Sequence, residues 1–243
     1  MSLFVIGDLH LSLSSNKPMD IFGGWDNYVS RLKENWLANV KDDDTVVIPG
    51  DITWAMSIDE AYEDFKFINE LPGKKIILKG NHDYWWTTKT KADKFFEENG
   101  FNTLNVLHNN HYEYEGFGIC GTRGWINDGS EPADAKVIKR EAMRLDRSIQ
   151  SAVDAGLKPI VFLHYPPIYG NDTNYDILDV LLKYDIKLCF YGHLHSYATK
   201  NALNGRCYGI EFRLISSDYL HFSPLDITQI VQSSKLWIRY RKY

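Results

Sequence analysis

The chain has 243 residues, a hydrophobic fraction of 44% and a formal net charge of −5, values that are ordinary for a globular protein. No run approaches the roughly 18 uninterrupted apolar residues of a membrane span, and the first apolar run is interrupted at Asp8, too early for a secretory signal. The balance of 27 Lys and Arg against 32 Asp and Glu argues against a broad basic face for nucleic acid. We therefore expect a single cytoplasmic domain over residues 1–243 that binds neither membrane nor nucleic acid, and the sequence leaves its oligomeric state open.

Apolar runs rich in Val, Ile and Phe and bounded by turn residues predict strands that are buried on both faces. In chain order these runs are Leu3–Ile6, Thr45–Pro49, Lys75–Leu78, Pro159–Leu163 and Leu188–Tyr191. Two segments between them have helical periodicity. The first begins at a capping box, Ser57–Glu60, and ends at Pro72-Gly73. The second carries apolar residues at helical spacing from Ile138 to Val153 and stops at Gly156, so the strand–helix–strand unit repeats.

Further strands and loops complete the predicted elements. The dipeptide Asn109-Asn110 lies between two short apolar runs and suggests a hairpin, and residues 208–215 and 236–240 suggest late strands. A second sheet is therefore expected. Residues 12–25 and 122–133 are rich in Ser, Gly, Pro and Asp, so we expect loops there that border a pocket.

A short polar cluster follows each of the five buried runs. In chain order the clusters are Gly7-Asp8-Leu9-His10, Gly50-Asp51, Gly80-Asn81-His82-Asp83, His164 and Gly192-His193-Leu194-His195. Because ligands of open α/β sheets gather beyond the carboxyl ends of the strands, we expect these clusters to meet at one site. A lone Asp-x-His is more often a capped turn than a ligand pair, but five clusters in succession favour a metal site. The glycines are expected to allow positive φ and to leave room for metal and substrate.

The residue types in these clusters match the ligand preferences of divalent transition metals. Asp carboxylates, neutral His nitrogens and an Asn carbonyl suit Mn, Fe, Co, Ni or Zn. The three cysteines have no paired spacing, which argues against a thiolate site and a disulfide scaffold. A carboxylate such as Asp51 can bridge two ions about 3.5–4 Å apart, the separation that suits two-metal hydrolysis. The sequence therefore predicts two divalent transition-metal ions whose identity it does not fix.

Taken in order from Asp8 to His195, the clusters resemble those of the calcineurin-like metallophosphoesterase family. The resemblance implies an α/β fold, a four-layer α/β/β/α sandwich, with two metal sites that share one carboxylate. The first site would be formed by Asp8, His10, Asp51 and His195, and the second by Asp51, Asn81, His164 and His193. By the same resemblance His82 would be the acid that protonates the leaving oxygen, and Asp83 would orient it.

Two departures from the broader family narrow this expectation. Asp51 is followed by Ile52-Thr53-Trp54, without the acidic residue that many relatives carry a few positions on. Asp83 is followed by Tyr84-Trp85-Trp86, without the arginine of the protein phosphatases. The resemblance therefore points to the bacterial-type branch, whose members hydrolyse phosphodiesters or phosphomonoesters of varied small substrates.

These features predict a metal-dependent phosphohydrolase that acts on a small phosphorylated substrate. A water bridging the two ions would be the nucleophile. A general acid favours a diester slightly, because the alkoxide of a diester is a poor leaving group. The alternatives are a small-substrate phosphomonoesterase or nucleotide hydrolase, a nuclease, and an inactive scaffold of the same fold. A nuclease would need a basic track and a scaffold would lack ligands, and the sequence has neither feature.

Two features near the predicted site have both a functional and a structural interpretation. Arg123, in a loop bounded by glycines, would either fork onto a substrate phosphate or form a structural ion pair. The aromatic run Tyr84-Trp85-Trp86 would either stack on the base of a nucleotide or pack in the core. The sequence does not decide between these interpretations.

Overall fold

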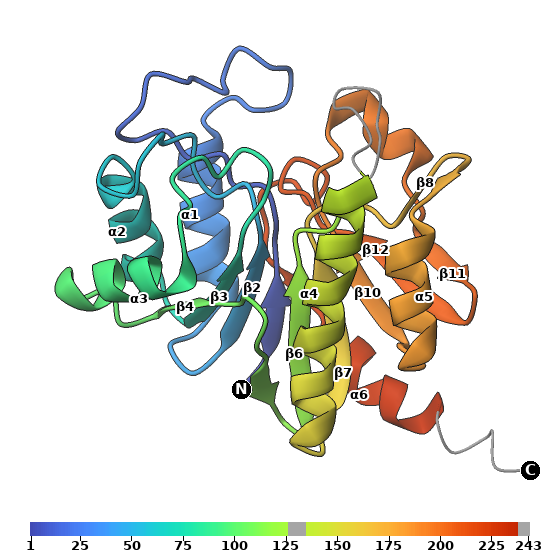
Figure 1. Ribbon diagram of the computed structural model, residues 1–243. Coiled ribbons are helices and arrows are strands. Elements are labelled where there is room, and N and C mark those ends of the chain that lie inside the picture. The colour runs from blue at the N-terminus through green and yellow to red at the C-terminus, as the bar shows by residue number, and fades with distance from the viewer. Residues whose placement is uncertain (126–134, 238–243) are drawn as a thin grey trace, which may run out of the picture.

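The computed structural model describes residues 1–125 and 135–237, which form two larger sheets between layers of helices (Figure 1). The first sheet has the order β13-β1-β2-β3-β4, in which β1 to β4 are parallel and β13 is antiparallel at the edge. The second has the order β11-β12-β10-β7-β6-β5, with four parallel strands between two antiparallel edge strands. The strands of the first sheet are β1 (Leu3–Val5), β2 (Thr45–Pro49), β3 (Lys74–Leu78), β4 (Leu104–Val106) and β13 (Leu225–Asp226). Those of the second are β5 (Tyr112–Tyr114), β6 (Phe117–Thr122), β7 (Lys158–Leu163), β10 (Leu188–Tyr191), β11 (Gly205–Cys207) and β12 (Ile210–Leu214).

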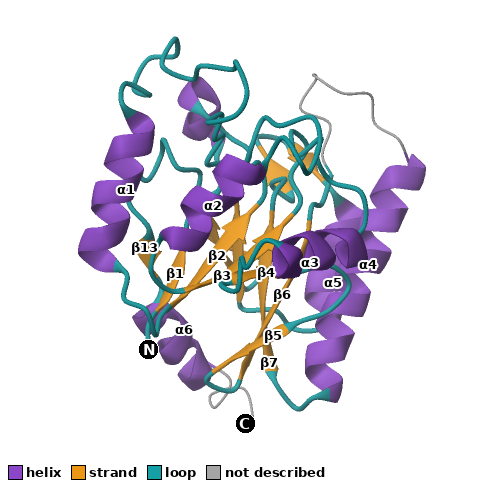
Figure 2. Cartoon of the chain, turned by 90° about the vertical axis from the view of Figure 1, so that its left-hand side faces the viewer, coloured by secondary structure: helices purple, strands orange, loops and turns teal. Residues whose placement is uncertain are grey.

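The helices before residue 184 cover the outer faces of the two sheets, and Figure 2 shows the strands enclosed between them. The helix that begins at Thr228 contributes instead to the cluster between the sheets. The elements outside the two larger sheets are α1 (Tyr28–Asn39), α2 (Tyr62–Glu70), α3 (Lys89–Glu98), α4 (Ala135–Asp154), α5 (Tyr175–Lys183), α6 (Thr228–Trp237), the 3-10 helix η1 (Ser196–Asn201) and a small hairpin of β8 (Ile168–Tyr169) and β9 (Asp172–Thr173). Within residues 1–125 and 135–237, no helix combines the length and the apolar character that crossing a membrane requires.

Three hydrophobic clusters fill the spaces between four layers. The first joins α1, α2 and α3 to the outer face of the first sheet, and the second joins α4 and α5 to the outer face of the second sheet. The third lies between the two sheets, where the rings of Phe162 and Phe190 stack with centroids 5.2 Å apart. Alternation along the strands sorts the side chains, because Phe4 of β1 belongs to the first cluster whereas Leu3 and Val5 belong to the third. The predicted four-layer α/β/β/α sandwich is confirmed.

The two predicted helices are present, with a later start for the first. Ser57 Oγ accepts a hydrogen bond from the backbone N–H of Glu60 at 3.2 Å, as a capping box requires, but the residues that follow form turns and α2 begins at Tyr62. The second helix, α4, ends at Asp154. Gly156 then adopts a φ of 75° and donates its N–H to the carbonyl of Val153 at 2.9 Å.

Two predictions about the secondary structure are wrong. The segment around Asn109-Asn110 is not a hairpin turn, because β4 belongs to the first sheet and β5 to the second. Asn109 does adopt the positive φ of a turn, 61°, but the turn carries the chain from one sheet to the other. In place of the strand predicted over 236–240, residues 236 and 237 form the end of α6. Residues 238–240 lie outside the described part of the chain. The predicted loop over 12–25 is present. Of the loop predicted over 122–133, residue 122 is the last residue of β6, residues 123–125 lie outside helices and strands, and residues 126–133 are outside the described part of the chain.

Candidate metal centre

The seven predicted ligands meet where the chain leaves the carboxyl ends of β1, β2, β3, β7 and β10, at the upper edge of the sheets in Figure 1. Six of them form two groups whose nitrogen and oxygen atoms all lie within 4.8 Å of one another in each group. The groups are Asp8, His10 and His195, and Asp51, His164 and His193. They belong to the two sets that the family resemblance assigns to separate metals, and the strands bring them together from opposite ends of the motif region.

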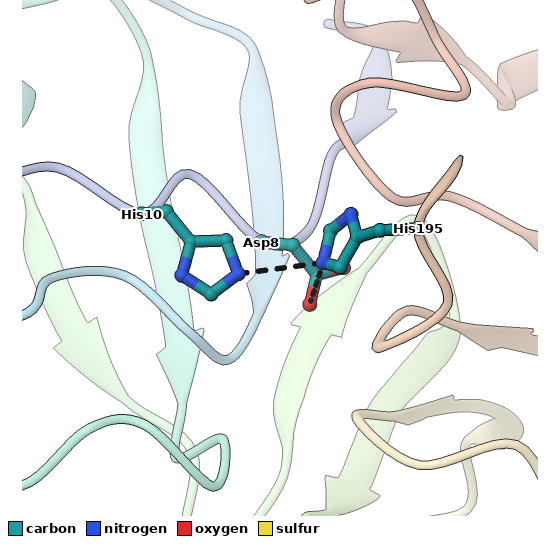
Figure 3. Close-up of side chains that lie close together, drawn as sticks. All are labelled: Asp8, His10 and His195. Atoms are coloured by element: carbon teal, nitrogen blue, oxygen red, sulfur yellow. Dashed lines mark hydrogen bonds and ion pairs between the residues drawn. The ribbon is translucent and has the colours of Figure 1, made fainter. Parts of the chain in front are cut away.

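The first group points its side chains at a common centre (Figure 3). His10 Nε2 lies 3.3 Å from His195 Nε2, and His195 Nε2 lies 3.7 Å from Asp8 Oδ1. The Nδ1 of His195 lies 2.8 Å from Asp218 Oδ1, which fixes the proton on Nδ1 and leaves the lone pair of Nε2 facing the centre. The three side chains therefore present two imidazole nitrogens and a carboxylate oxygen to one point.

The second group is completed by the amide oxygen of Asn81. This Oδ1 lies 2.6 Å from His164 Nε2 and 3.0 Å from His193 Nδ1. His164 Nδ1 donates to the carbonyl of Pro49 at 3.1 Å, so its Nε2 is the nitrogen left to bind a metal. Two imidazole nitrogens and the Asn81 oxygen thus converge, as the resemblance implies for the second site.

Asp51 lies between the two groups. Its Oδ2 is 3.7 Å from His10 Nε2 of the first group and 3.5 Å from His164 Nε2 of the second. Its Oδ1 accepts a hydrogen bond from the backbone N–H of His82 at 2.8 Å, which holds the carboxylate in this orientation. A carboxylate that faces both groups has the geometry that a bridging ligand needs.

Four of the candidate ligands are held in left-handed backbone conformations. The φ values are 58° for Asp8, 46° for His10, 50° for Asp51 and 71° for His193. Such conformations cost on the order of 1 kcal/mol or more per non-glycine residue and persist only where the surroundings enforce them. Hydrogen bonds between the loops do so here, since Asp8 donates its N–H to Gly50 O at 3.0 Å and His10 donates to Asp51 O at 2.9 Å. Strain is therefore concentrated at the site.

The glycines beside the ligands serve the site mainly by leaving space. Gly50 alone of the four in the clusters has a positive φ, 89°. A Cβ on Gly80 would collide with Asp51 Oδ1, and a Cβ on Gly192 would collide with Asp8 Oδ2. The predicted positive φ is thus wrong for Gly7, Gly80 and Gly192, while the close approach of two ligand carboxylates requires glycine at the last two.

Burial makes the charges at this site unfavourable unless cations are present. Asp8, Asp51 and His164 are fully buried or nearly so. Burial raises the pKa of Asp8 to about 6, and burial together with the charges of Asp83 and Asp8 raises the pKa of Asp51 well above its usual range. Burial also lowers the pKa of His10 and of His164 well below the usual value. Neutral imidazoles beside carboxylates that lack a counter-charge are the environment that divalent cations would complete, and the all-N/O donor set fits the metals expected.

The role of Asp83 differs from the one that the resemblance implies. Its two oxygens accept hydrogen bonds from the backbone N–H groups of Asp51 at 2.9 Å, Ile52 at 2.9 Å and Gly80 at 2.7 Å, and from Trp85 Nε1 at 2.9 Å. The side chain is fully buried. These bonds hold the loop after β2 against the loop after β3. Asp83 therefore positions Asp51 and does not orient His82.

His82 lies beside the first group without belonging to it. Its Nδ1 is 3.1 Å from the hydroxyl of Tyr84, which takes the place predicted for Asp83. Trp54 packs between two imidazoles, with its ring centroid 4.5 Å from that of His82 and 4.9 Å from that of His10. Of the aromatic run after Asp83, Trp85 is buried in the core while Tyr84 is about half exposed beside His82. The run is thus divided between packing and the site.

Asp218 is the functional residue that the sequence pattern misses. It accepts from His195 Nδ1 through Oδ1 and from the backbone N–H of Ser196 at 3.0 Å through Oδ2. Burial acts to lower the pKa of His195, but the hydrogen bond to Asp218 and the charges of Asp8 and Asp218 together raise this pKa. Asp218 follows β12, the next strand of the second sheet, so the rule that ligands gather beyond strand ends is the signal that would have found it.

Arg123 lies outside both groups, and its backbone is the part that touches the site. The carbonyl oxygen accepts hydrogen bonds from the N–H of His164 at 3.1 Å and of Tyr165 at 2.8 Å. The guanidinium is 3.9 Å from Glu141 Oε1 and lies over the ring of Trp125 at 4.7 Å. The structural ion pair considered from the sequence is therefore present, and the side chain points into a separate cavity.

Solved structures that are similar to this chain include three proteins at 15–16% identity. The protein of unknown function AQ665 from Aquifex aeolicus has a similar fold, with a TM-score of 0.55 at 16% identity over 96% of this chain and 98% of that one. Phosphopantetheinyl hydrolase (PptH) from Mycobacterium tuberculosis gives a TM-score of 0.48 at 16% identity, covering 88% of each chain. Purple acid phosphatase PPD1 from yellow lupin gives 0.43 at 15% identity, covering 80% of this chain and 38% of that one.

A search of curated proteins finds no match. The family model for calcineurin-like phosphoesterases matches residues 1–197, a range that contains all seven candidate ligands. The family binds two metal ions, and the two ligand groups of this structure correspond to that number. The chain belongs to the calcineurin-like phosphoesterase family.

Proposed function

We propose that the protein is a dinuclear-metal phosphoester hydrolase with a slight preference for phosphodiesters of small molecules. The observation that carries the proposal is the placement of Asp51, whose Oδ2 faces His10 at 3.7 Å and His164 at 3.5 Å. A scaffold without activity would not need a buried carboxylate between two imidazole groups, because an unpaired buried charge is costly. The metal ions would be held by Asp8, His10, Asp51 and His195 on one side and by Asp51, Asn81, His164 and His193 on the other.

Two ions held in this way supply a water of lowered pKa and polarise the phosphoryl oxygens. The chain itself must position the ester and deliver a proton to the leaving oxygen. His82 lies at the edge of the first group and is within reach of Tyr84 through Nδ1, which leaves Nε2 available to the leaving group. We assign His82 the role of general acid on this geometry.

The free site does not hold His82 in its protonated form. Burial and the neighbouring His193 and His195 lower the pKa of His82 to about 4, so its imidazole is neutral at pH 7. A bound phosphoester brings negative charge close to the ring and raises the pKa of the imidazole. Proton delivery by His82 therefore depends on the substrate, and the diester preference depends on this step, since an alkoxide leaves poorly without a proton.

The alternative that a specific observation favours is a nucleotide substrate. Tyr84 is exposed over about half of its surface beside His82, and Trp54 has its ring in contact with His82. Aromatic faces at the edge of the site would stack on a base. A panel of cyclic nucleotides, alkyl diesters and monoesters, assayed with chelated protein reloaded with Mn, Fe, Co, Ni, Zn or Mg, separates these substrate classes.

The His82→Ala variant tests the assignment of the acid. A general acid contributes typically about 10²–10⁴-fold, so the variant should keep both metals and lose rate mainly on esters of alkyl alcohols. On a nitrophenyl ester, whose leaving group needs no proton, the loss should be much smaller. His111→Ala is the matched control. His111 Nδ1 lies 2.8 Å from Ser151 Oγ, and neither residue neighbours a candidate ligand in the sequence. Loss of metal would make His82 a ligand, and equal losses on both esters would refute proton donation.

A further inference from the structure

A second polar cavity is lined by residues from the loop after β3 and from α4. It is bounded by the end of β3, the segment that leads into α3, the end of β6 and the first half of α4. Its volume is about 360 Å³, within the range of roughly 300–1,000 Å³ that is usual for small-molecule sites. None of the seven candidate metal ligands lines it.

Positive charge predominates in this cavity. Its cationic side chains are Lys79, Arg123, Arg140 and Arg144. Among the described residues that line the cavity, Glu141 is the one carboxylate, and it is fully buried. Glu141 accepts hydrogen bonds from Thr122 Oγ1 at 2.6 Å and from Arg144 at 2.5 Å, and lies 3.9 Å from Arg123. A single carboxylate offsets one of four positive charges, so an excess remains.

Several of these cationic donors have no acceptor among the residues that the structure describes. Arg123 Nε is buried and has no hydrogen-bond partner, while the ring of Trp125 under the guanidinium fixes its plane. Among the described residues, Lys79 and Arg140 form no hydrogen bond or ion pair with one another or with a third residue. The remaining titratable side chain, His108, adds no charge at neutral pH, because burial and the neighbouring Arg144 lower its pKa. Unused donors around an enclosed space call for an anion with several acceptor oxygens.

We propose that this cavity is an oxyanion site that binds a phosphoryl group other than the one at the metal centre. Guanidinium groups bind phosphate through paired N–H donors, and Arg123 and Arg144 are held in place by Glu141. Two backbone connections link the cavity to the second ligand group. Lys79 precedes Asn81 by two residues, and the carbonyl oxygen of Arg123 accepts a hydrogen bond from the N–H of His164.

Two sources would supply such a group. A substrate with two phosphoryl groups would place one at the metal centre and the other in the cavity, a use that rests on the proposed function. Free inorganic phosphate would occupy the cavity whether or not the protein is a hydrolase. The chemistry of recognition is the same in both cases.

Calorimetric titration of the metal-loaded protein with inorganic phosphate tests the cavity directly. We expect one class of site that depends on the cavity and a second that depends on the metals. Arg140→Gln is expected to weaken the first class at least about tenfold, as loss of a hydrogen bond to a charged group implies, and to leave the second unchanged. Arg147→Gln is the matched control, because Arg147 is exposed on the same helix and outside this cavity.

Substrate pairs then distinguish the two sources. The nitrophenyl ester of thymidine 5′-phosphate is compared with the same ester carrying a 3′-phosphate. A lower KM for the second ester that disappears in Arg140→Gln but not in Arg147→Gln assigns the cavity to the substrate. Equal KM values with intact phosphate binding assign it to a free anion. If no ester is hydrolysed, the proposed function fails, whereas phosphate binding that Arg140→Gln weakens still supports the oxyanion site. If neither Arg140→Gln nor Lys79→Gln weakens phosphate binding, the oxyanion site is refuted.

Discussion

Replacing Asp83 by Asn tests whether this residue holds the loops together or orients His82. Its two oxygens accept five hydrogen bonds in a fully buried position. Oδ2 accepts two of 2.7–2.9 Å, and Oδ1 accepts two of 2.9 Å and a longer one of 3.4 Å from the N–H of Thr53. Asn offers one acceptor oxygen and one NH₂ group. Whichever way the amide turns, at least two of the five N–H donors then face another donor and lose their acceptor.

The cost follows from those two lost bonds. A buried donor without an acceptor costs about 1–3 kcal/mol, so Asp83→Asn should lower the free energy of unfolding by about 2–6 kcal/mol, a large fraction of the roughly 5–15 kcal/mol of a typical domain. Because two of the donors are the N–H groups of Asp51 and Gly80, the Asp51 carboxylate should also lose its orientation and both metals should bind more weakly.

Denaturant unfolding of the metal-free protein measures this loss without a contribution from metal affinity. Tyr84→Phe is the control, since it removes the hydroxyl beside His82 Nδ1 from a side chain that is about half exposed. That variant should unfold within about 0.5 kcal/mol of the parent. If Asp83→Asn is equally stable and instead slows only the alkyl esters, Asp83 serves His82 and our assignment of its hydrogen bonds is incorrect.

Three further predictions concern the ligands. Asp218→Ala should weaken metal binding about 10–100-fold in a chelator competition, because it removes the hydrogen-bond acceptor of His195 Nδ1; an unchanged affinity would contradict this role. In metal-free protein the folded pKa of Asp8, about 6, lies above the unfolded 3.8, so its protonation stabilises the fold at acidic pH. Between pH 5 and 7.5 the free energy of unfolding should fall by about 1.4 kcal/mol. The Asp8→Asn variant should not show this fall. Gly192→Ala should displace the Asp8 carboxylate and lose metal by elemental analysis, whereas Gly23→Ala, which meets nothing within 4 Å, should not.

The buried strands and the meeting of the polar clusters follow from local sequence patterns, whereas the four-layer sandwich and the division of the ligands into two groups came from the family resemblance. The buried runs that became β2 and β10 need only apolar residues bounded by turns, and the clusters after them need only the rule that strand ends gather ligands. The alternation that puts Phe4 on one face of β1 and Val5 on the other requires no knowledge of the partner layers.

The features that the sequence did not predict depend on contacts between distant segments. The segment at Asn109 has the composition of a hairpin, yet only the pairing of β4 and β5 with different sheets shows that it is a crossover. Asp218 is 23 residues from His195 and has no motif around it. Asp83 neighbours His82 in sequence, but its buried position turns its oxygens toward the loop after β2. Local spacing cannot determine which of several nearby donors a carboxylate accepts from.

Elemental analysis of protein purified without a chelator tests the dinuclear centre most directly. With both ligand groups sharing Asp51, we expect close to two transition-metal ions per chain, and the Asp51→Asn variant should weaken binding at both sites rather than at one. A protein that takes up one ion or none with Mn or Zn in excess would contradict the account, as would an Asp51→Asn variant with full metal content and full turnover.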